Sequence, residues 1–314
     1  MAIEAPASEL NIEMVSLGKL VWINVERPTE SEIDYLRRNF SFHPLDLDDC
    51  LSKIQRPKID EYDDYLFIVL HFPVYNKRAR VTISGEVDIF IGASYVITVH
   101  NGDLRPLNRF YRECASDEKA REASMSQSSS YLLYQLVDRL VDSCFPILNK
   151  IAANIERVDE NIFSEDAKGT VRELSVIRRD IIAFRRIIKP QLPVIASLER
   201  KDWPFLKEEL EVYWGNIADH LNRIWDILED YRDVVEGLAA TNDSLTSYRM
   251  NEVIKVLTII STIMLPLAVI SSIYGMNISV LPFADSQHSF LITLAIMGAT
   301  VGVMLWFFRF RQWI

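Results

Sequence analysis

One segment near the C-terminus carries almost no charge. Residues 256–308 contain no lysine or arginine, and Asp285 is their single acid. The segment consists of two apolar runs, residues 256–274 and 290–308. Each run of about 19 residues would measure about 29 Å as a helix, which is the thickness of one hydrocarbon core. We therefore predict two transmembrane helices joined as a hairpin by a short loop.

Basic residues lie only at the two outer ends of this hairpin. Arg249 and Lys255 precede the first run, Arg309 and Arg311 follow the second, and the loop between the runs has none. Because basic flanks stay on the cytoplasmic side, both ends are expected inside and the loop outside. The chain is thus expected in the cell (inner) membrane, as a two-span protein with both termini cytoplasmic.

The composition of the whole chain restricts the classes of function. A formal charge of -10 argues against nucleic acid as a partner and suits an attraction for cations. The three cysteines are scattered without a Cys-x-x-Cys pair, so the sequence signals neither a disulfide framework nor a zinc site. No phosphate-binding glycine loop, metalloprotease helix or nucleophile elbow occurs. We expect a protein that is not an enzyme and holds no organic cofactor.

Residues 1–126 have the pattern of an α/β domain. Thr29 and Glu32 form a capping box at the start of a predicted helix, and a second helix is predicted to open at Pro44. Segments rich in β-branched and aromatic residues, bounded by glycines, predict the strands of a small sheet. These segments are residues 20–25, 65–72, 80–84, 87–91 and 95–100.

Residues 127–208 are predicted to form an antiparallel helical hairpin. Apolar periodicity predicts one long helix over residues 128–163, followed by a turn at residues 164–169. A second helix is expected to start at Thr170, with Glu173 completing a capping box, and to end at Lys189 before Pro190.

The next helix carries an apolar residue at alternating steps of four and three. This heptad stripe predicts a stalk over residues 209–255 that continues without a break into the first span. A coiled-coil tether for a membrane-anchored domain would explain the stripe equally well. The stripe consists of Leu210, Trp214, Ile217, Leu221, Ile224, Leu228, Tyr231, Val235 and Leu238. We place the first span at residues 256–277, the external loop at 278–289, the second span at 290–308 and a basic tail at 309–314.

Two motifs resemble those of the CorA family of divalent-cation channels. The first is Tyr274-Gly275-Met276-Asn277 at the end of the first span, preceded by Asn-Glu-Val-Ile-Lys-Val-Leu-Thr at residues 251–258. The second is His-Pro-Leu-Asp-Leu-Asp-Asp at residues 43–49, followed by Gln-Arg-Pro-Lys at residues 55–58. The resemblance implies an α+β cytoplasmic domain and a long stalk helix that continues into a C-terminal two-helix transmembrane hairpin, a helical membrane protein.

The resemblance also implies a function and a partner. CorA relatives are homopentamers that pass divalent cations, chiefly Mg²⁺ and in some cases Co²⁺ or Ni²⁺, so the chain is expected to associate with itself in the lipid bilayer. A ring of amide and backbone oxygens suits Mg²⁺, which releases its waters reluctantly. Tyr274, Gly275, Met276 and Asn277 would form the selectivity filter. Alternatively, a glycine and an asparagine at this place only cap the helix.

Further positions are assigned by the same resemblance. Asn251, Leu257, Leu265 and Ala268 would face the pore, where leucine rings can gate by dewetting. Lipid contact or helix packing remains open for each leucine taken singly.

Acids at the start of the second helix of the α/β domain would bind regulatory Mg²⁺. Asp48 and Asp49 take this role in the resemblance, but their usual partner on the stalk is replaced by Ala240, which leaves Asp243 as a substitute. Acids in a first helical turn also stabilise the helix dipole without any metal.

The external loop departs from the family. Its usual Met-Pro-Glu-Leu is missing, so Asp285 and His288 are the remaining candidates for the mouth. The departure keeps a CorA-fold zinc transporter open as an alternative, and a membrane-anchored scaffold or enzyme is the alternative from another class.

Overall fold

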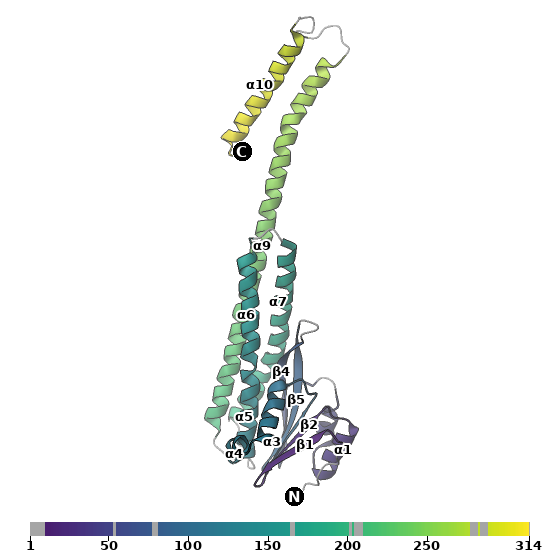
Figure 1. The fold of residues 1–314 in the computed structure, drawn as a ribbon, viewed down its shortest axis with the longest axis vertical. Helices are drawn as coiled ribbons and strands as arrows, with labels where there is room; N and C mark the ends of the chain where they lie inside the picture. The colour runs from purple at the N-terminus through teal and green to yellow at the C-terminus, as the bar shows by residue number, and fades with distance from the viewer. Residues whose placement is uncertain are drawn as a thin grey trace. The chain divides into compact units, whose positions relative to one another are not determined.

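The computed structural model describes residues 10–52, 55–76, 81–163, 167–200, 203, 210–276, 282 and 288–313. The chain separates into two compact units, Met1–Ala239 and Ala240–Ile314. The first unit contains a sheet and a group of helices, and the second contains two apolar helical segments (Figure 1).

A six-stranded sheet lies at the centre of the first unit. Its strand order is β1-β2-β6-β5-β4-β3, in which only β2 and β6 pair in parallel. The strands are β1 Ile12–Leu17, β2 Leu20–Glu26, β3 Lys58–Glu61, β4 Tyr65–Asn76, β5 Val81–Gly92 and β6 Tyr95–His100.

The two faces of the sheet bury different side chains. Alternation along the strands places Val25, Val69 and Val99 on one face, in the core cluster with α1 (Glu30–Asn39) and α2 (Pro44–Asp49). The opposite face carries Trp22, whose ring lies 5.1 Å from the rings of Phe110 and Tyr111 in α3 (Arg105–Ser116). The sheet is therefore covered on both faces.

Several local predictions for this unit are confirmed. The capping box of Thr29 and Glu32 is present, and α2 begins at Pro44. The predicted strands 80–84 and 87–91, however, form the single strand β5, which passes through Gly85 opposite Phe72. A Cβ atom on Gly85 would lie 2.8 Å from Leu104, so this glycine permits a close approach and does not end a strand. Strands β1 and β3 were not predicted.

The helices of the first unit differ from prediction at two places. The predicted helix 128–163 is divided at Ser143 into α5 and α6, because Pro146 has no N–H to donate to the carbonyl of Asp142. The predicted cap at Thr170 is wrong, because the helix already begins at Ala167. The helices are α4 Glu118–Met125, α5 Ser129–Asp142, α6 Cys144–Asn161, α7 Ala167–Ile188, the 3-10 turn Lys189–Gln191 and α8 Leu192–Arg200.

The predicted long helix is confirmed as α9, Glu211–Tyr274. The heptad stripe, except Tyr231, is buried within this chain alone: Ile217, Ile224 and Leu228 are 0% exposed. The ring of Trp214 lies 6.4 Å from that of Tyr134 in α5. The stripe therefore packs against helices of its own chain, and it is no argument for a coiled coil between subunits.

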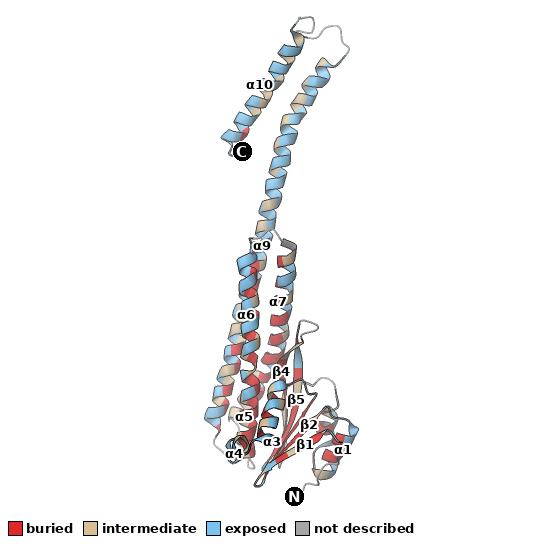
Figure 2. Cartoon of the chain, viewed as in Figure 1, coloured by how far each residue is buried: buried red, intermediate tan, exposed pale blue. Residues whose placement is uncertain are grey.

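The second unit contains the apolar part of α9 and α10, Ser289–Phe310. Both helices are long and apolar enough to cross a membrane, and none of the residues in their most apolar windows is buried inside the chain. A core helix of a soluble protein would be mostly buried, whereas this part of α9 and α10 is coloured mainly as exposed or intermediate in Figure 2. This exposure of apolar side chains fits two helices that span a membrane.

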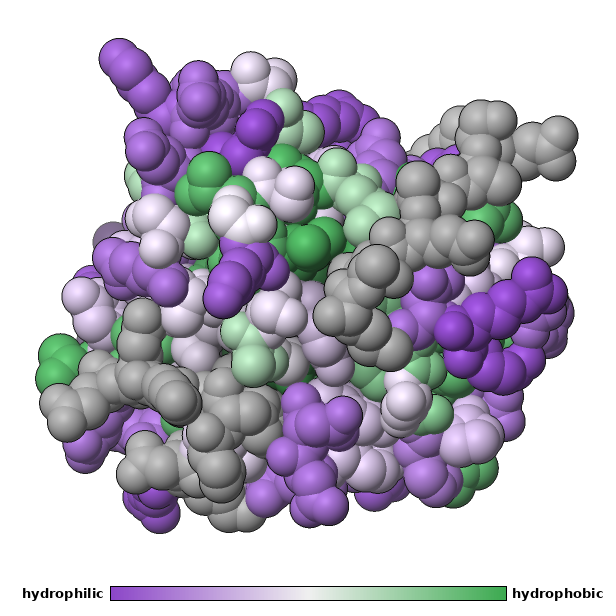
Figure 3. Space-filling model, turned by 90° about the horizontal axis from the view of Figure 1, so that it is seen from below, coloured by the Kyte–Doolittle hydropathy of each residue, from purple (hydrophilic) through white to green (hydrophobic). Residues whose placement is uncertain are grey.

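The end of the first unit that holds the α/β domain has a different surface. Figure 3 looks onto this end, where hydrophilic side chains predominate and apolar side chains occupy smaller areas. A polar surface with small apolar areas is typical of a domain in contact with water.

Candidate functional site

The C-terminal end of α9 holds the described part of the predicted filter. The N–H of Gly275 donates to the carbonyl of Ser271 at 2.9 Å, and the N–H of Met276 donates to that of Ile273 at 3.2 Å. The Tyr274 hydroxyl donates to the carbonyl of Pro282 in the loop at 3.3 Å. The helix thus ends at Tyr274, and Asn277 lies outside the described residues.

The predicted pore residues share one side of α9. At about 100° per residue, Asn251, Leu257, Leu265 and Ala268 fall within an arc of about 120°. All four are exposed, and Leu265 is 70% exposed. Asn251 also lines an open pocket together with Lys255 and, from the C-terminal end, Arg311, Gln312 and Trp313. Exposure of an apolar arc is what a subunit interface or a lipid-facing surface requires, and the pore assignment stays a prediction.

Of the two residues predicted to lie at the external mouth, only His288 is among the residues that the structure describes. His288 is exposed and directly precedes α10, whereas Asp285 lies outside the described residues.

The predicted regulatory acids have unequal surroundings. Asp48 is exposed. Asp49 is engaged within the chain, because its Oδ2 lies 2.8 Å from Nζ of Lys58 and its Oδ1 accepts a hydrogen bond from Nε2 of Gln55 at 2.9 Å. Asp243 is exposed and belongs to the second unit. A cation at Asp49 would therefore compete with Lys58.

A further acid of the same helix, Asp46, has a structural role that the sequence did not reveal. Its two oxygens accept hydrogen bonds from the hydroxyls of Tyr62 at 3.1 Å and Tyr65 at 2.9 Å. Burial raises the pKa of Asp46, while the two hydroxyls lower it. These bonds attach α2 to the sheet and so position Asp48 and Asp49.

A cavity of about 230 Å³ opens beside the same helix. Its described lining includes Cys50, His71, Glu86 and Asp88, with no lysine or arginine. Asp88 is 3% exposed, and its Oδ1 has no hydrogen-bond partner among the residues that the structure describes. Burial, and next the charge of Glu86, raise the pKa of Asp88 well above its ordinary value. Burial therefore disfavours the charged form of this carboxyl group.

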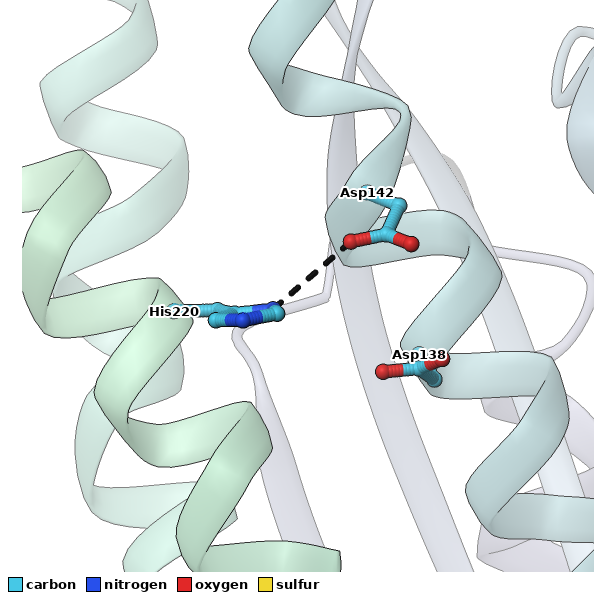
Figure 4. Close-up of side chains that lie close together, drawn as sticks. All are labelled: Asp138, Asp142 and His220. Carbon is cyan, nitrogen blue, oxygen red and sulfur yellow. Dashed lines mark ion pairs between the residues drawn. The ribbon is translucent and has the colours of Figure 1, made fainter.

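Three metal-ligating side chains meet elsewhere in the first unit. Asp138 and Asp142 project from α5 toward His220 of α9 (Figure 4). One ligand atom of each residue lies within 4.8 Å of the other two. The spacing of the two acids by four residues could have indicated a shared helix face. Their proximity to His220 depends on tertiary packing and has no sequence signal.

Comparisons with known proteins agree over nearly the whole chain. The family model described as "CorA-like Mg2+ transporter protein" matches residues 18–309. The chain is 33% identical over 300 residues to a cobalt/magnesium transport protein CorA of Thermotoga maritima, covering 93% of this chain and 83% of that protein. It is 32% identical to a putative metal ion transporter of Bacillus subtilis, covering 91% of this chain and 88% of that protein.

A solved structure has the same fold. The complete CorA magnesium transporter from Methanocaldococcus jannaschii superimposes with a TM-score of 0.86, covering 96% of this chain and 94% of that chain at 22% identity. The expected architecture, an α+β domain with a long helix and a C-terminal apolar helix, is therefore confirmed.

Proposed function

The chain belongs to the family of CorA-like Mg²⁺ transporter proteins, and on that premise we propose that it is a homopentameric channel for passive influx of divalent cations, with Mg²⁺ the principal ion. The observation that carries the proposal is the family match over residues 18–309, and it is supported by the sequence, in which Gly-Met-Asn directly follows Tyr274, the last residue of α9. Co²⁺ and Ni²⁺ are the expected minor ions. The filter consists of Tyr274, Gly275, Met276 and Asn277. The two spans lie in the cell (inner) membrane, and both termini lie in the cytoplasm.

The mechanism follows from the chemistry of hydrated ions. Mg²⁺ keeps several of its waters, so the amide and carbonyl oxygens at Asn277 and Gly275 contact the ion largely through those waters. One asparagine supplies a single amide, and a ring therefore requires several chains around an axis. Below the filter, Leu257, Leu265 and Ala268 narrow the pore with apolar groups, which close it by dewetting. Asp285 and His288 attract cations to the mouth.

Reconstitution of the purified full-length protein tests this proposal. Liposomes with an inside-negative potential are expected to accumulate Mg²⁺ without nucleotide, because the potential alone drives a cation inward. Mass measurement of the detergent complex should give five chains. Liposomes that take up Zn²⁺ and exclude Mg²⁺ would favour the zinc transporter, and the absence of any divalent flux would favour an anchored scaffold or enzyme.

Feedback by cytoplasmic Mg²⁺ is proposed to act through Asp49, with Asp48 and, from a neighbouring subunit, Asp243 as further ligands. Without metal, two carboxylates about 5 Å apart at an effective dielectric constant near 20 repel by roughly 3 kcal/mol, which favours the open state. In this chain Lys58 already neutralises Asp49, and we expect the feedback to be weak.

Uptake measured against internal Mg²⁺ tests the regulatory role. In Asp49→Asn, the internal Mg²⁺ concentration that halves uptake is expected to rise measurably, but by no more than about fivefold, which is equivalent to about 1 kcal/mol. Asp64→Asn, an exposed acid of the same domain, is the matched control. Loss of all inhibition in Asp49→Asn would contradict the weak feedback, and inhibition equal to wild type would remove Asp49 from regulation.

A further inference from the structure

Asp138, Asp142 and His220 form a cluster with the donors of a metal site. Asp138 and Asp142 are one turn apart on α5, and His220 comes from α9, so all three lie in the first unit. One ligand atom of each residue lies within 4.8 Å of the other two, which is the order of separation found around a single ion. Figure 4 shows the imidazole directed toward the two carboxylates.

The imidazole of His220 is half-buried, with its side chain 33% exposed. Nδ1 of His220 is buried and has no hydrogen-bond partner within the described part of the chain. It lies 3.6 Å from Oδ1 of Asp142, too long for a hydrogen bond. The ring of Phe145 meets the imidazole edge-on at 5.9 Å, which holds the orientation of the ring. A buried ring nitrogen of this kind needs either a proton or an ion.

Among the described residues no lysine or arginine forms an ion pair with either carboxylate, and the ion partner of Asp142 is His220. The guanidinium of the neighbouring Arg139 is engaged elsewhere. It lies 3.0 Å from Glu113 and 4.1 Å from the ring centroid of Phe110. The two acids are four residues apart on one face of α5, where like charges repel.

We propose that Asp138, Asp142 and His220 bind one divalent transition-metal ion of the Co²⁺, Ni²⁺ or Zn²⁺ class within a single chain. The site is separate from the predicted filter and from Asp48, Asp49 and Asp243, and it does not depend on the pentamer. An imidazole nitrogen favours these ions over Mg²⁺, which prefers oxygen ligands throughout. The ligand atoms have to approach by about 1 Å to reach bond lengths near 2.1 Å, which side-chain rotation provides. Three protein ligands leave the remaining positions to water.

The same geometry would also fit an ion pair between His220 and Asp142 without a metal ion. The two readings differ in what Co²⁺ does. A metal that binds the imidazole protects it from acylation by diethylpyrocarbonate, whereas a bare ion pair gives no such metal-dependent protection. His43, an exposed histidine of the α/β domain, provides an internal reference in the same digest.

The experiment uses the full-length protein in detergent, with CoCl₂ or MgCl₂ as the probe and mass spectrometry of the His220 peptide as the readout. Co²⁺ is expected to protect His220 at concentrations at least about tenfold below those of Mg²⁺. In Asp138→Asn/Asp142→Asn, the Co²⁺ concentration needed for protection should rise at least about tenfold, since two charged ligands are replaced by neutral ones. Asp230→Asn, an exposed acid of α9, is the control and should match wild type.

Equilibrium dialysis gives a second measure, the number of Co²⁺ ions bound per chain. Other metal sites contribute equally to both variants, so they cancel in the difference. The number of Co²⁺ ions bound per chain is expected to fall by one in the double variant relative to Asp230→Asn. The Asp→Asn changes relieve repulsion and keep the shape of the side chains, so the helices should stay folded, which a melting curve verifies. Labelling of His220 that ignores Co²⁺ in the wild type would overturn the proposal. Protection and stoichiometry that are unchanged in the double variant would also overturn it.

Discussion

Asn277→Ala is expected to reduce Mg²⁺ uptake by at least about 30-fold, since losing about 1 kcal/mol at only two of five subunits already gives that factor. The substitution removes an amide oxygen and leaves the apolar surfaces of both spans intact. Assembly should therefore be unchanged. The measurement is Mg²⁺ entry into liposomes that contain equal amounts of wild-type or variant protein.

Gln287→Ala is the matched control for this prediction, because it removes a carboxamide from the adjoining loop without touching the Gly-Met-Asn motif. Its uptake should stay close to that of wild type. If Asn277→Ala transports as well as Gln287→Ala, the filter does not involve Asn277, and the motif serves only to end the helix.

Ile224→Ala is expected to destabilise the first unit by about 2–5 kcal/mol, the usual cost of truncating a fully buried isoleucine. Ile224 is 0% exposed and lies in the stripe of α9 that packs inside the chain. For a unit of this size, the cost corresponds to a fall in Tm of about 4–20 °C. Thermal unfolding of the full-length protein in detergent measures this change.

Val212→Ala is the control for Ile224→Ala, because Val212 is on the same helix and is 82% exposed. Its Tm should change little, as exposed substitutions seldom cost more than about 0.5 kcal/mol. Equal melting of the two variants would contradict the packing of α9 against its own chain. Melting that depends strongly on protein concentration for Ile224→Ala alone would indicate that subunits cover the stripe instead.

Local features of the fold could be predicted from the sequence because their causes are local. The capping box of Thr29 and Glu32 joins residues three apart, and β6 is bounded by turn residues on both sides. Residues 256–308, with Asp285 as their single acid, are likewise apolar enough by themselves to favour entry into a membrane. The family assignment followed from the short contiguous motif that ends at Asn277.

Errors appeared where a local signal competed with packing. Gly85 was taken as the end of a strand, yet β4 supplies a partner along the whole length of β5. The heptad stripe of α9 has the period of a coiled coil, but that period describes any apolar face of a helix and does not identify the partner. In this chain the partners are its own helices.

The ion-binding groups depended most on the tertiary structure. The sequence placed Asp49 among the candidate metal ligands, and folding then brought Lys58 to within 2.8 Å of it. His220 is separated by more than seventy residues from Asp142, so no spacing rule could join them. The sequence by itself determined two membrane spans, the long helix and the motif at its end, because these follow from runs of neighbouring residues. Only the tertiary structure decided which charges are neutralised and which carboxylates meet a histidine, because those contacts form between helices and strands that are distant along the chain.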